Sequence, residues 1–242
     1  MKKMKKISTL ALLVIMASSC TNDPSTTGSV ALKASTVSTV GKTSLTARSA
    51  VASTVVFTDF KINIGNIKFE TDEQDESHNT EPEHTDIKLN GPFLLDLLDP
   101  NSLLSQSITS VDIPNAKYEE IKFTFEPSLV VGEMNGKSYL IKGTVNGKTF
   151  EVWSTKKIEL GLDFKDPTKD FTVNNNNLSL NIKIQLDAII AKIADLAGQG
   201  LLTDTDGDGV IEISTDSDDG HSDLGEQIRN LLENEADLDD KD

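Results

Sequence analysis

Three aspartates at alternate positions form the group of side chains in this sequence with the clearest chemistry. Asp204, Asp206 and Asp208 follow one another with single residues between them, and Gly209 comes next. Calcium is a hard cation that takes about six to eight oxygen ligands, and carboxylates at alternate positions of a tight loop can converge on one ion. Gly209 permits the sharp turn that such a loop needs. The pattern therefore predicts a calcium site.

The segment that begins at Asp204 resembles the first nine positions of an EF-hand-type loop. In this interpretation the backbone carbonyl of Val210 is a ligand, and Glu212 stands at the ninth position. The twelfth position departs from that family, because Thr215 replaces the bidentate glutamate. An acid further along must then close the coordination shell, which disfavours the opening motion of a calcium sensor and favours a structural ion.

Asp216, Asp218 and Asp219 are the candidates for the closing ligand. We predict calcium as the cofactor, with the ligands Asp204, Asp206, Asp208, Val210, Glu212 and Asp219. The alternative is a solvated acidic linker that binds cations only diffusely.

Two amphipathic segments flank the acidic loop. Residues 187–196 and 222–233 both space their apolar side chains as a helix does. Ser222 or Asp223 could cap the second helix, with His221 at its start. Residues 187–242 are therefore predicted to form a helix–calcium loop–helix extension.

Residues 55–186 are predicted to form the main domain, because their apolar residues recur mostly with a period of two. A phase slip at Gly65 predicts a β-bulge, and Asn146-Gly147 predicts a tight hairpin. With no helices between the strands, the expected fold is all-β, an antiparallel β-sandwich. The expected strands cover residues 55–57, 60–69, 87–89, 93–98, 118–125, 138–144, 148–153, 158–164 and 178–184.

The N-terminal residues have the order of a secretory signal: lysines, a short apolar run at 10–16, and small residues before Cys20. The segment resembles a lipoprotein signal peptide, which implies removal of residues 1–19, lipidation of Cys20 and attachment to a membrane. A secreted protein with a free thiol is the alternative. Residues 20–54 are rich in Ser and Thr and are expected to form a tether, although residues 29–34 alternate well enough for an edge strand.

The chain has 39 acidic and 23 basic residues, with a formal charge of −16. The acids concentrate in residues 70–86 and 201–242, whereas the rest of the chain after residue 19 is close to neutral. Nucleic-acid binding is therefore not expected, since it needs a basic surface. The only cysteine is Cys20, so no disulfide can form within the chain.

Three segments together carry a family resemblance: residues 93–98 (FLLDLL), 113–121 (IPNAKYEEI) and 160–164 (LGLDF). They resemble an uncharacterised family of β-sandwich lipoprotein domains from Gram-negative envelopes. The resemblance covers roughly residues 55–185. It implies a sandwich fold and a lipid-anchored place in the bacterial envelope, and we expect the outer membrane, on its periplasmic or surface face. It brings no catalytic residue.

A non-enzymatic, calcium-stabilised binding or structural module fits these features best, with a glycan or protein as its unidentified ligand. The alternative is an envelope hydrolase of glycans or esters that uses a carboxylate pair. His78 and His84 form a weaker candidate for zinc or copper. Tyr139 and Trp153 flank the hairpin; an inward Trp153 is expected, and an exposed pair that stacks on sugars is the alternative.

Overall fold

The structure is a computed structural model, and it describes residues 26–37, 46–48, 53–71, 86–98, 106–163, 171–216, 219–234 and 236–240. These residues form strands and two helices. In chain order they are β1 (Thr27–Val37), β2 (Thr46–Arg48), β3 (Thr54–Thr71), β4 (Ile87–Asp96), β5 (Gln106–Pro114), β6 (Lys117–Phe125), β7 (Tyr139–Val145), β8 (Lys148–Ser154), β9 (Ile158–Asp163), β10 (Phe171–Thr172), β11 (Asn177–Gln185), α1 (Asp187–Gly198), β12 (Val210–Ile213), α2 (Ser222–Asn234) and β13 (Ala236–Asp240).

The strands make two sheets, which confirms the all-β sandwich with C-terminal helices. The larger sheet has nine strands along the order β10-β6-β3-β7-β8-β12, with β2 and β4 also paired to β3 and β9 to β6. The smaller sheet has the order β13-β11-β1-β5. Most pairs are antiparallel as predicted, but β1 with β11 and β8 with β12 are parallel. Both parallel pairs join strands that are far apart in the sequence.

Strand β3 is the longest element and runs through the middle of the larger sheet. Its first half pairs with β7, and its second half pairs with β6 on one side and β4 on the other. The register shifts between Ile64 and Asn66 in both pairings of the second half, which confirms the predicted bulge at Gly65. A second shift, between Phe57 and Asp59, keeps the buried positions on one face of the strand.

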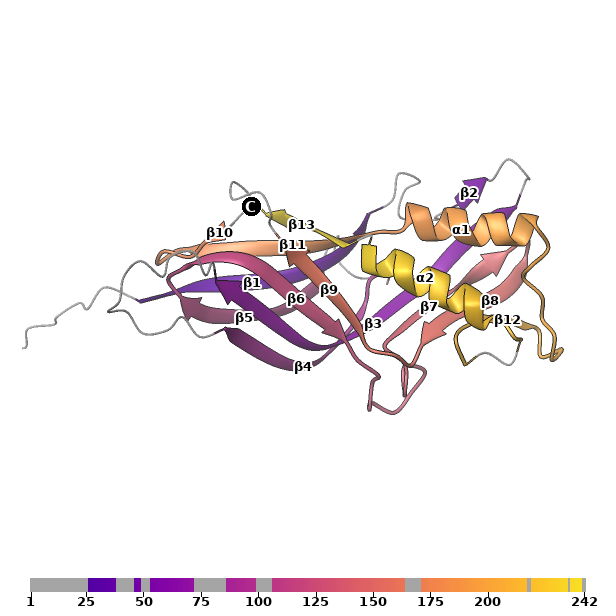
Figure 1. Cartoon of the computed structure of the whole chain (residues 1–242), viewed down its shortest axis with the longest axis horizontal. Helices are drawn as coiled ribbons and strands as arrows, with labels where there is room; N and C mark the ends of the chain where they lie inside the picture. The colour runs from indigo at the N-terminus through magenta and orange to yellow at the C-terminus, as the bar shows by residue number, and fades with distance from the viewer. Residues whose placement is uncertain are drawn as a thin grey trace, which may run out of the picture.

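The inner face of the larger sheet is covered by two different layers (Figure 1). The smaller sheet lies against one end of it, and α1 and α2 lie over the other end, near β7, β8 and β12. Apolar side chains from both sheets and both helices belong to one hydrophobic core. The predicted helices are confirmed, with α1 and α2 each extending one or two residues beyond the predicted C-terminal end.

Within the predicted tether over residues 20–54, Thr46–Arg48 is strand β2, and the alternative of a strand at residues 29–34 is correct, as part of the longer strand Thr27–Val37. This segment is strand β1, and it lies inside the smaller sheet between β5 and β11. Val30, Leu32 and Ala34 are buried on its inner face, whereas the residues between them are half-exposed. The Ser and Thr residues of this segment, which predicted a tether, do not prevent it from forming a strand. Residues 1–25, including Cys20, lie outside the described residues.

The predicted division between a sandwich at 55–186 and an added tail at 187–242 also needs correction. Strand β12 extends the larger sheet by pairing in parallel with β8. Strand β13 pairs with β11 in the smaller sheet. The C-terminal quarter of the chain therefore contributes a strand to each sheet, in addition to the two helices that cover the core.

Neither helix of the described residues is long and apolar enough to cross a membrane.

Helix α2 touches the backbone after β12 at Gly225, and this contact yields a first prediction. A Cβ on Gly225 would lie 2.6 Å from the carbonyl carbon of Ser214 and 2.7 Å from its Cα. Alanine favours a helix over glycine by about 1 kcal/mol. We nevertheless expect Gly225→Ala to lower the free energy of unfolding by about 1–3 kcal/mol, because the rigid backbone of Ser214 must move.

Urea unfolding measures this effect, and Gln227→Ala, at an exposed position of the same helix, is the control. A Gly225→Ala protein at least as stable as the unaltered chain would contradict the close packing of α2 on Ser214.

Candidate metal centre

The acidic loop lies between α1 and β12, and its turn is held by Asp204. The two carboxylate oxygens of Asp204 accept hydrogen bonds from the N–H groups of Gly207, at 2.7 Å, and Gly209, at 3.0 Å. Both glycines have positive φ values, 82° and 94°, a region that side chains with a Cβ rarely adopt. The aspartate and the two glycines therefore define the shape of the loop.

The next two aspartates each accept a hydrogen bond from the residue two positions ahead. The carboxylate of Asp206 accepts from the N–H of Asp208 at 3.1 Å, and that of Asp208 accepts from Val210 at 2.8 Å. Such local bonds are typical of aspartate in turns. Both side chains are exposed to solvent, so each keeps oxygen lone pairs for other partners.

Asp219 reaches the same loop from the other side of β12. Its side chain is buried, with 5% exposure. One carboxylate oxygen accepts from the backbone N–H and the hydroxyl of Thr205, and the other accepts from the N–H of Glu212 at 2.8 Å. These bonds fix the Asp219 carboxylate between the acidic loop and strand β12.

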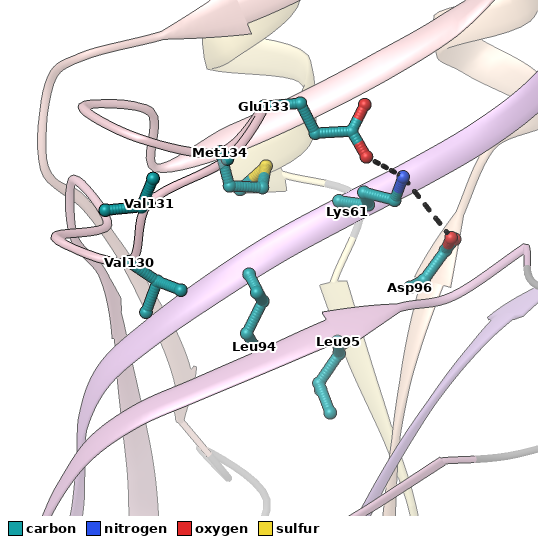
Figure 2. A pocket seen from close by; sticks show the side chains of 9 residues that line it. Lys61, Leu94, Leu95, Asp96, Val130, Val131, Glu133 and Met134 are labelled. Carbon is teal, nitrogen blue, oxygen red and sulfur yellow. Dashed lines mark hydrogen bonds and ion pairs between the residues drawn. The ribbon is translucent and has the colours of Figure 1, made fainter.

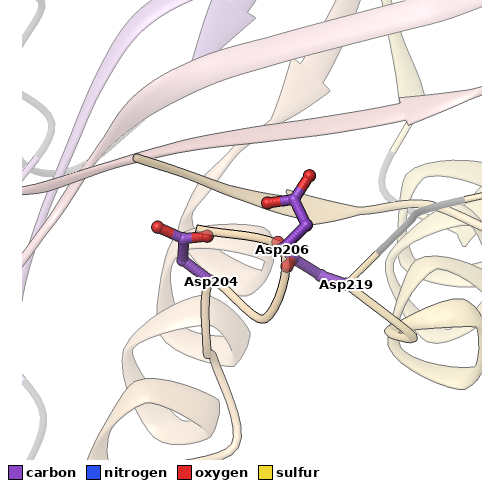
Figure 3. Close-up of side chains that lie close together, drawn as sticks. All are labelled: Asp204, Asp206 and Asp219. Carbon is purple, nitrogen blue, oxygen red and sulfur yellow. The ribbon is translucent and has the colours of Figure 1, made fainter. Parts of the chain in front are cut away.

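Carboxylate oxygens of Asp204, Asp206 and Asp219 all lie within 4.8 Å of one another (Figure 3). Three carboxylates at this separation supply hard oxygen ligands from two separate segments of the chain. Asp206 is exposed and Asp219 is buried, so solvent reaches the group at Asp206. Water could therefore complete the coordination of a cation held there.

The pKa values of Asp219 and Asp206 shift in opposite directions. Burial raises the pKa of Asp219, but the N–H groups of Glu212 and Thr205 outweigh it, and the net pKa is lowered. The N–H of Asp208 lowers the pKa of Asp206, yet partial desolvation and the neighbouring carboxylates outweigh it and raise the net pKa. The repulsion at Asp206 is what a bound cation would relieve.

His221 contacts the backbone just before the acidic loop. Its Nε2 lies 2.9 Å from the carbonyl oxygen and 3.2 Å from the nitrogen of Thr203, the residue before Asp204. Its backbone carbonyl accepts the N–H of Gly225 in the first turn of α2. His221 therefore lies at the start of α2, as predicted, and in addition joins this helix to the acidic loop. Sequence alone gave little sign of this contact, because 18 residues separate the partners.

Three of the six predicted ligands are brought together: Asp204, Asp206 and Asp219. Asp208 and Glu212 lie outside this group of carboxylates. Glu212 stands on β12 beside Glu151 of β8 and contributes its backbone N–H to the centre. Val210 is the first residue of β12, and its proposed carbonyl ligand stays a prediction. Asp218, the lipidation residue Cys20, and His78 and His84 lie outside the described residues.

The aromatic residues beside the hairpin do not form an exposed pair. Tyr139 is fully buried, and within the described residues its hydroxyl makes no hydrogen bond. Trp153 is half-buried on the outer face of β8, with the ammonium of Lys137 5.2 Å from its ring centre. The expectation of an inward Trp153 is therefore wrong. Side chains alternate along β8, and the buried ones on either side of Trp153 are those of Val152 and Ser154.

Comparisons with known proteins leave the family open. No protein-family model matches the chain, and no curated protein matches it. Among solved structures, MbnP from Methylosinus trichosporium is similar over 68% of this chain and 78% of its own, with a TM-score of 0.39 and 12% sequence identity.

The contacts of Asp219 predict a structural role that is separate from metal binding. In the presence of a chelator, Asp219→Ala should lower the free energy of unfolding by about 1–3 kcal/mol, because it removes a buried carboxylate that accepts hydrogen bonds from Thr205 and Glu212.

Urea unfolding in EDTA checks this value. Asp208→Ala is the matched control, since it removes an exposed aspartate that accepts one local bond. Equal stabilities of the two variants would show that Asp219 does not hold the loop to β12.

Proposed function

We propose that this chain is a lipid-anchored protein of the bacterial cell envelope whose domain is stabilised by calcium and acts as a non-enzymatic binding or structural module. The observation that carries the calcium proposal is the convergence of Asp204, Asp206 and Asp219 from two sides of β12. The proposed ligand set adds Asp208, the Val210 carbonyl and Glu212, which neighbour the three in the sequence.

The chemistry of the group favours calcium. All three side chains are carboxylates, and hard oxygen ligands suit calcium better than the softer transition metals, which prefer imidazole or thiolate. The carboxylates of Asp204 and Asp219 also accept hydrogen bonds from several backbone N–H groups, which hold them in position before an ion binds. Little reorganisation would then accompany binding.

A cation in this position would act as a structural link. Asp204 and Asp206 follow α1, whereas Asp219 precedes α2 by three residues. An ion shared among them would join the ends of both helices to β12, and any ligand that binds only the folded state stabilises it. It would also offset part of the repulsion among the acids in residues 201–242.

The envelope location rests on the N-terminal pattern and on the family resemblance. The lysines, the short apolar run and the small residues before Cys20 support export and lipidation, and the resemblance to envelope lipoprotein domains supports the outer membrane. Calcium outside the cytoplasm is abundant enough, at about millimolar levels, to occupy weak sites of this class. The partner that the sequence indicates is then a membrane, to which a lipid on Cys20 would attach the chain.

Among the carboxylates near Lys61, Glu133 is unsuited to be the general acid of the alternative, a hydrolase, whereas burial raises the pKa of Asp96. Glu133 and Asp96 both contact the Lys61 ammonium. The hydrogen bond from Lys61, together with that from Lys142, lowers the pKa of Glu133 to about 2. A general acid in glycoside hydrolysis needs a raised pKa, so Glu133 is unsuited to that role.

Calorimetric titration with calcium tests the proposal. We expect one ion per chain, and we expect Asp206→Ala to lower the affinity by well over tenfold, because it removes a ligand while leaving the buried Asp219 in place. Asp195→Ala, which removes an equal charge from an exposed position of α1, is the control and should keep the affinity.

Thermal melts with calcium and with EDTA complete the test. The melting temperature should rise with calcium in the unaltered chain and in Asp195→Ala, but not in Asp206→Ala. Titration curves that are identical for all three proteins would contradict the assignment of the site.

A further inference from the structure

A pocket of about 350 Å³ opens on the outer face of the larger sheet, away from the acidic loop. Its floor comes from β3 and β4, and one wall comes from the loop between β6 and β7 (Figure 2). Leu94 of β4 and Val130, Val131 and Met134 of the loop supply its apolar lining. Lys61, Asp96 and Glu133 supply the charged groups on one side.

Apolar side chains are exposed around this pocket more than elsewhere in the described residues. Leu129 is 91% exposed and Val131 is 95% exposed, whereas Leu94 and Val130 are each 45% exposed. Elsewhere in the described part of the chain, Leu201 alone among the large apolar residues is similarly exposed. Contiguous exposed apolar groups of this kind mark interaction sites in soluble domains.

The loop that carries these side chains is held in one conformation. The N–H of Ser128 donates to the carbonyl of Lys137 at 3.0 Å, and the N–H of Gly136 donates to the carbonyl of Ser128 at 2.7 Å. The hydroxyl of Ser128 accepts the N–H of Val130 at 3.1 Å. Met134 is buried and anchors the loop to the sheet. A partner would therefore meet a surface that is already ordered, which lowers the cost of binding.

Carboxylates outnumber lysines in the ion-pair network beside the pocket. The Lys61 ammonium contacts three carboxylates: Asp59 at 3.3 Å, Asp96 at 3.8 Å, and Glu133. Glu133 also pairs with Lys142 at 2.9 Å, and Lys142 in turn pairs with Glu151 at 3.0 Å. Glu151 also pairs with Lys137 at 3.7 Å, so the network has four carboxylates and three lysines, and the side chain of Glu133 is 43% exposed. A cationic group next to the pocket would be attracted.

We propose that this surface binds a segment of a partner protein that places an apolar side chain in the pocket and a neighbouring lysine or arginine beside Glu133. The pocket is concave, which a flat lipid surface does not fill. A second copy of this chain carries the same acidic excess and a formal charge of −16, so like charges oppose self-association. The inference goes beyond the calcium proposal and uses no residue of the acidic loop.

An array of random-sequence dodecapeptides, incubated with the full chain, tests this surface. The peptides that bind should be enriched in a large apolar residue within three positions of lysine or arginine. For the best synthetic peptide, Val131→Asp should weaken binding at least about tenfold, because it places a charge at the apolar contact. Leu201→Asp introduces the same change at an exposed leucine elsewhere and should leave the affinity unchanged. Val131 is 95% exposed, so its substitution should not alter the melting temperature.

Glu133→Gln tests the contribution of the negative charge to peptide binding, apart from that of the apolar contact. It should weaken binding of the selected peptide by about two- to fivefold, the range of an exposed ion pair. It should not weaken a version of the peptide in which norleucine replaces the lysine or arginine. Measurements in calcium and in EDTA keep this test distinct from that of the metal centre, since the peptide should bind in both.

Several results would overturn the proposal. Peptides enriched in acidic residues, or without any preference, would do so, as would equal binding by Val131→Asp. Val131-dependent binding to phosphatidylcholine vesicles without peptide binding would assign the surface to lipid instead. A dimer in sedimentation experiments that Val131→Asp dissolves would assign it to a second copy of the chain.

Discussion

The architecture depends on strand β3, which both halves of the molecule share. Its first half pairs with β7, which leads to β8 and β12, and its second half pairs with β4 and β6, beneath the smaller sheet. The two register shifts in this long strand bend it and change the phase of its alternation, so that its buried positions stay on the core side. The inner face of β3 thus stays apolar beneath both the smaller sheet and the helices (Figure 1).

This arrangement separates the two candidate sites. The acidic loop lies at the helical end, where β12 closes the larger sheet and Asp219 joins the loop to that strand. The pocket lies on the opposite, outer face of the sheet, where Lys61 of β3 is held among carboxylates. The carboxylates at the two sites have different partners. Around Asp219 they accept backbone N–H groups and form the proposed cation site, whereas around Lys61 they pair with lysine side chains and outnumber them.

Local patterns in the sequence predicted much of the fold and part of the centre. Apolar alternation located most strands, Asn146-Gly147 gave the hairpin with both residues at positive φ, and the aspartate spacing identified Asp204 and Asp206. Strand β5 was missed because Ile108 and Val111 break the period of two. Contacts between distant segments had no local sign: the parallel pairing of β1 with β11 and of β12 with β8, and the bond of Asp219 to Thr205, depend on tertiary packing. The exposed loop at Leu129 was missed because an apolar run ordinarily predicts burial.

Hydrogen exchange of the full chain, resolved by peptide and compared in calcium and in EDTA, tests the central claim most directly. If a calcium ion links the ends of α1 and α2 to β12, calcium should slow exchange in the peptides that cover residues 203–213 and 219–228, and leave β4, β5 and β6 unchanged. Exchange rates in residues 203–228 that are the same with calcium and with EDTA would contradict the claim.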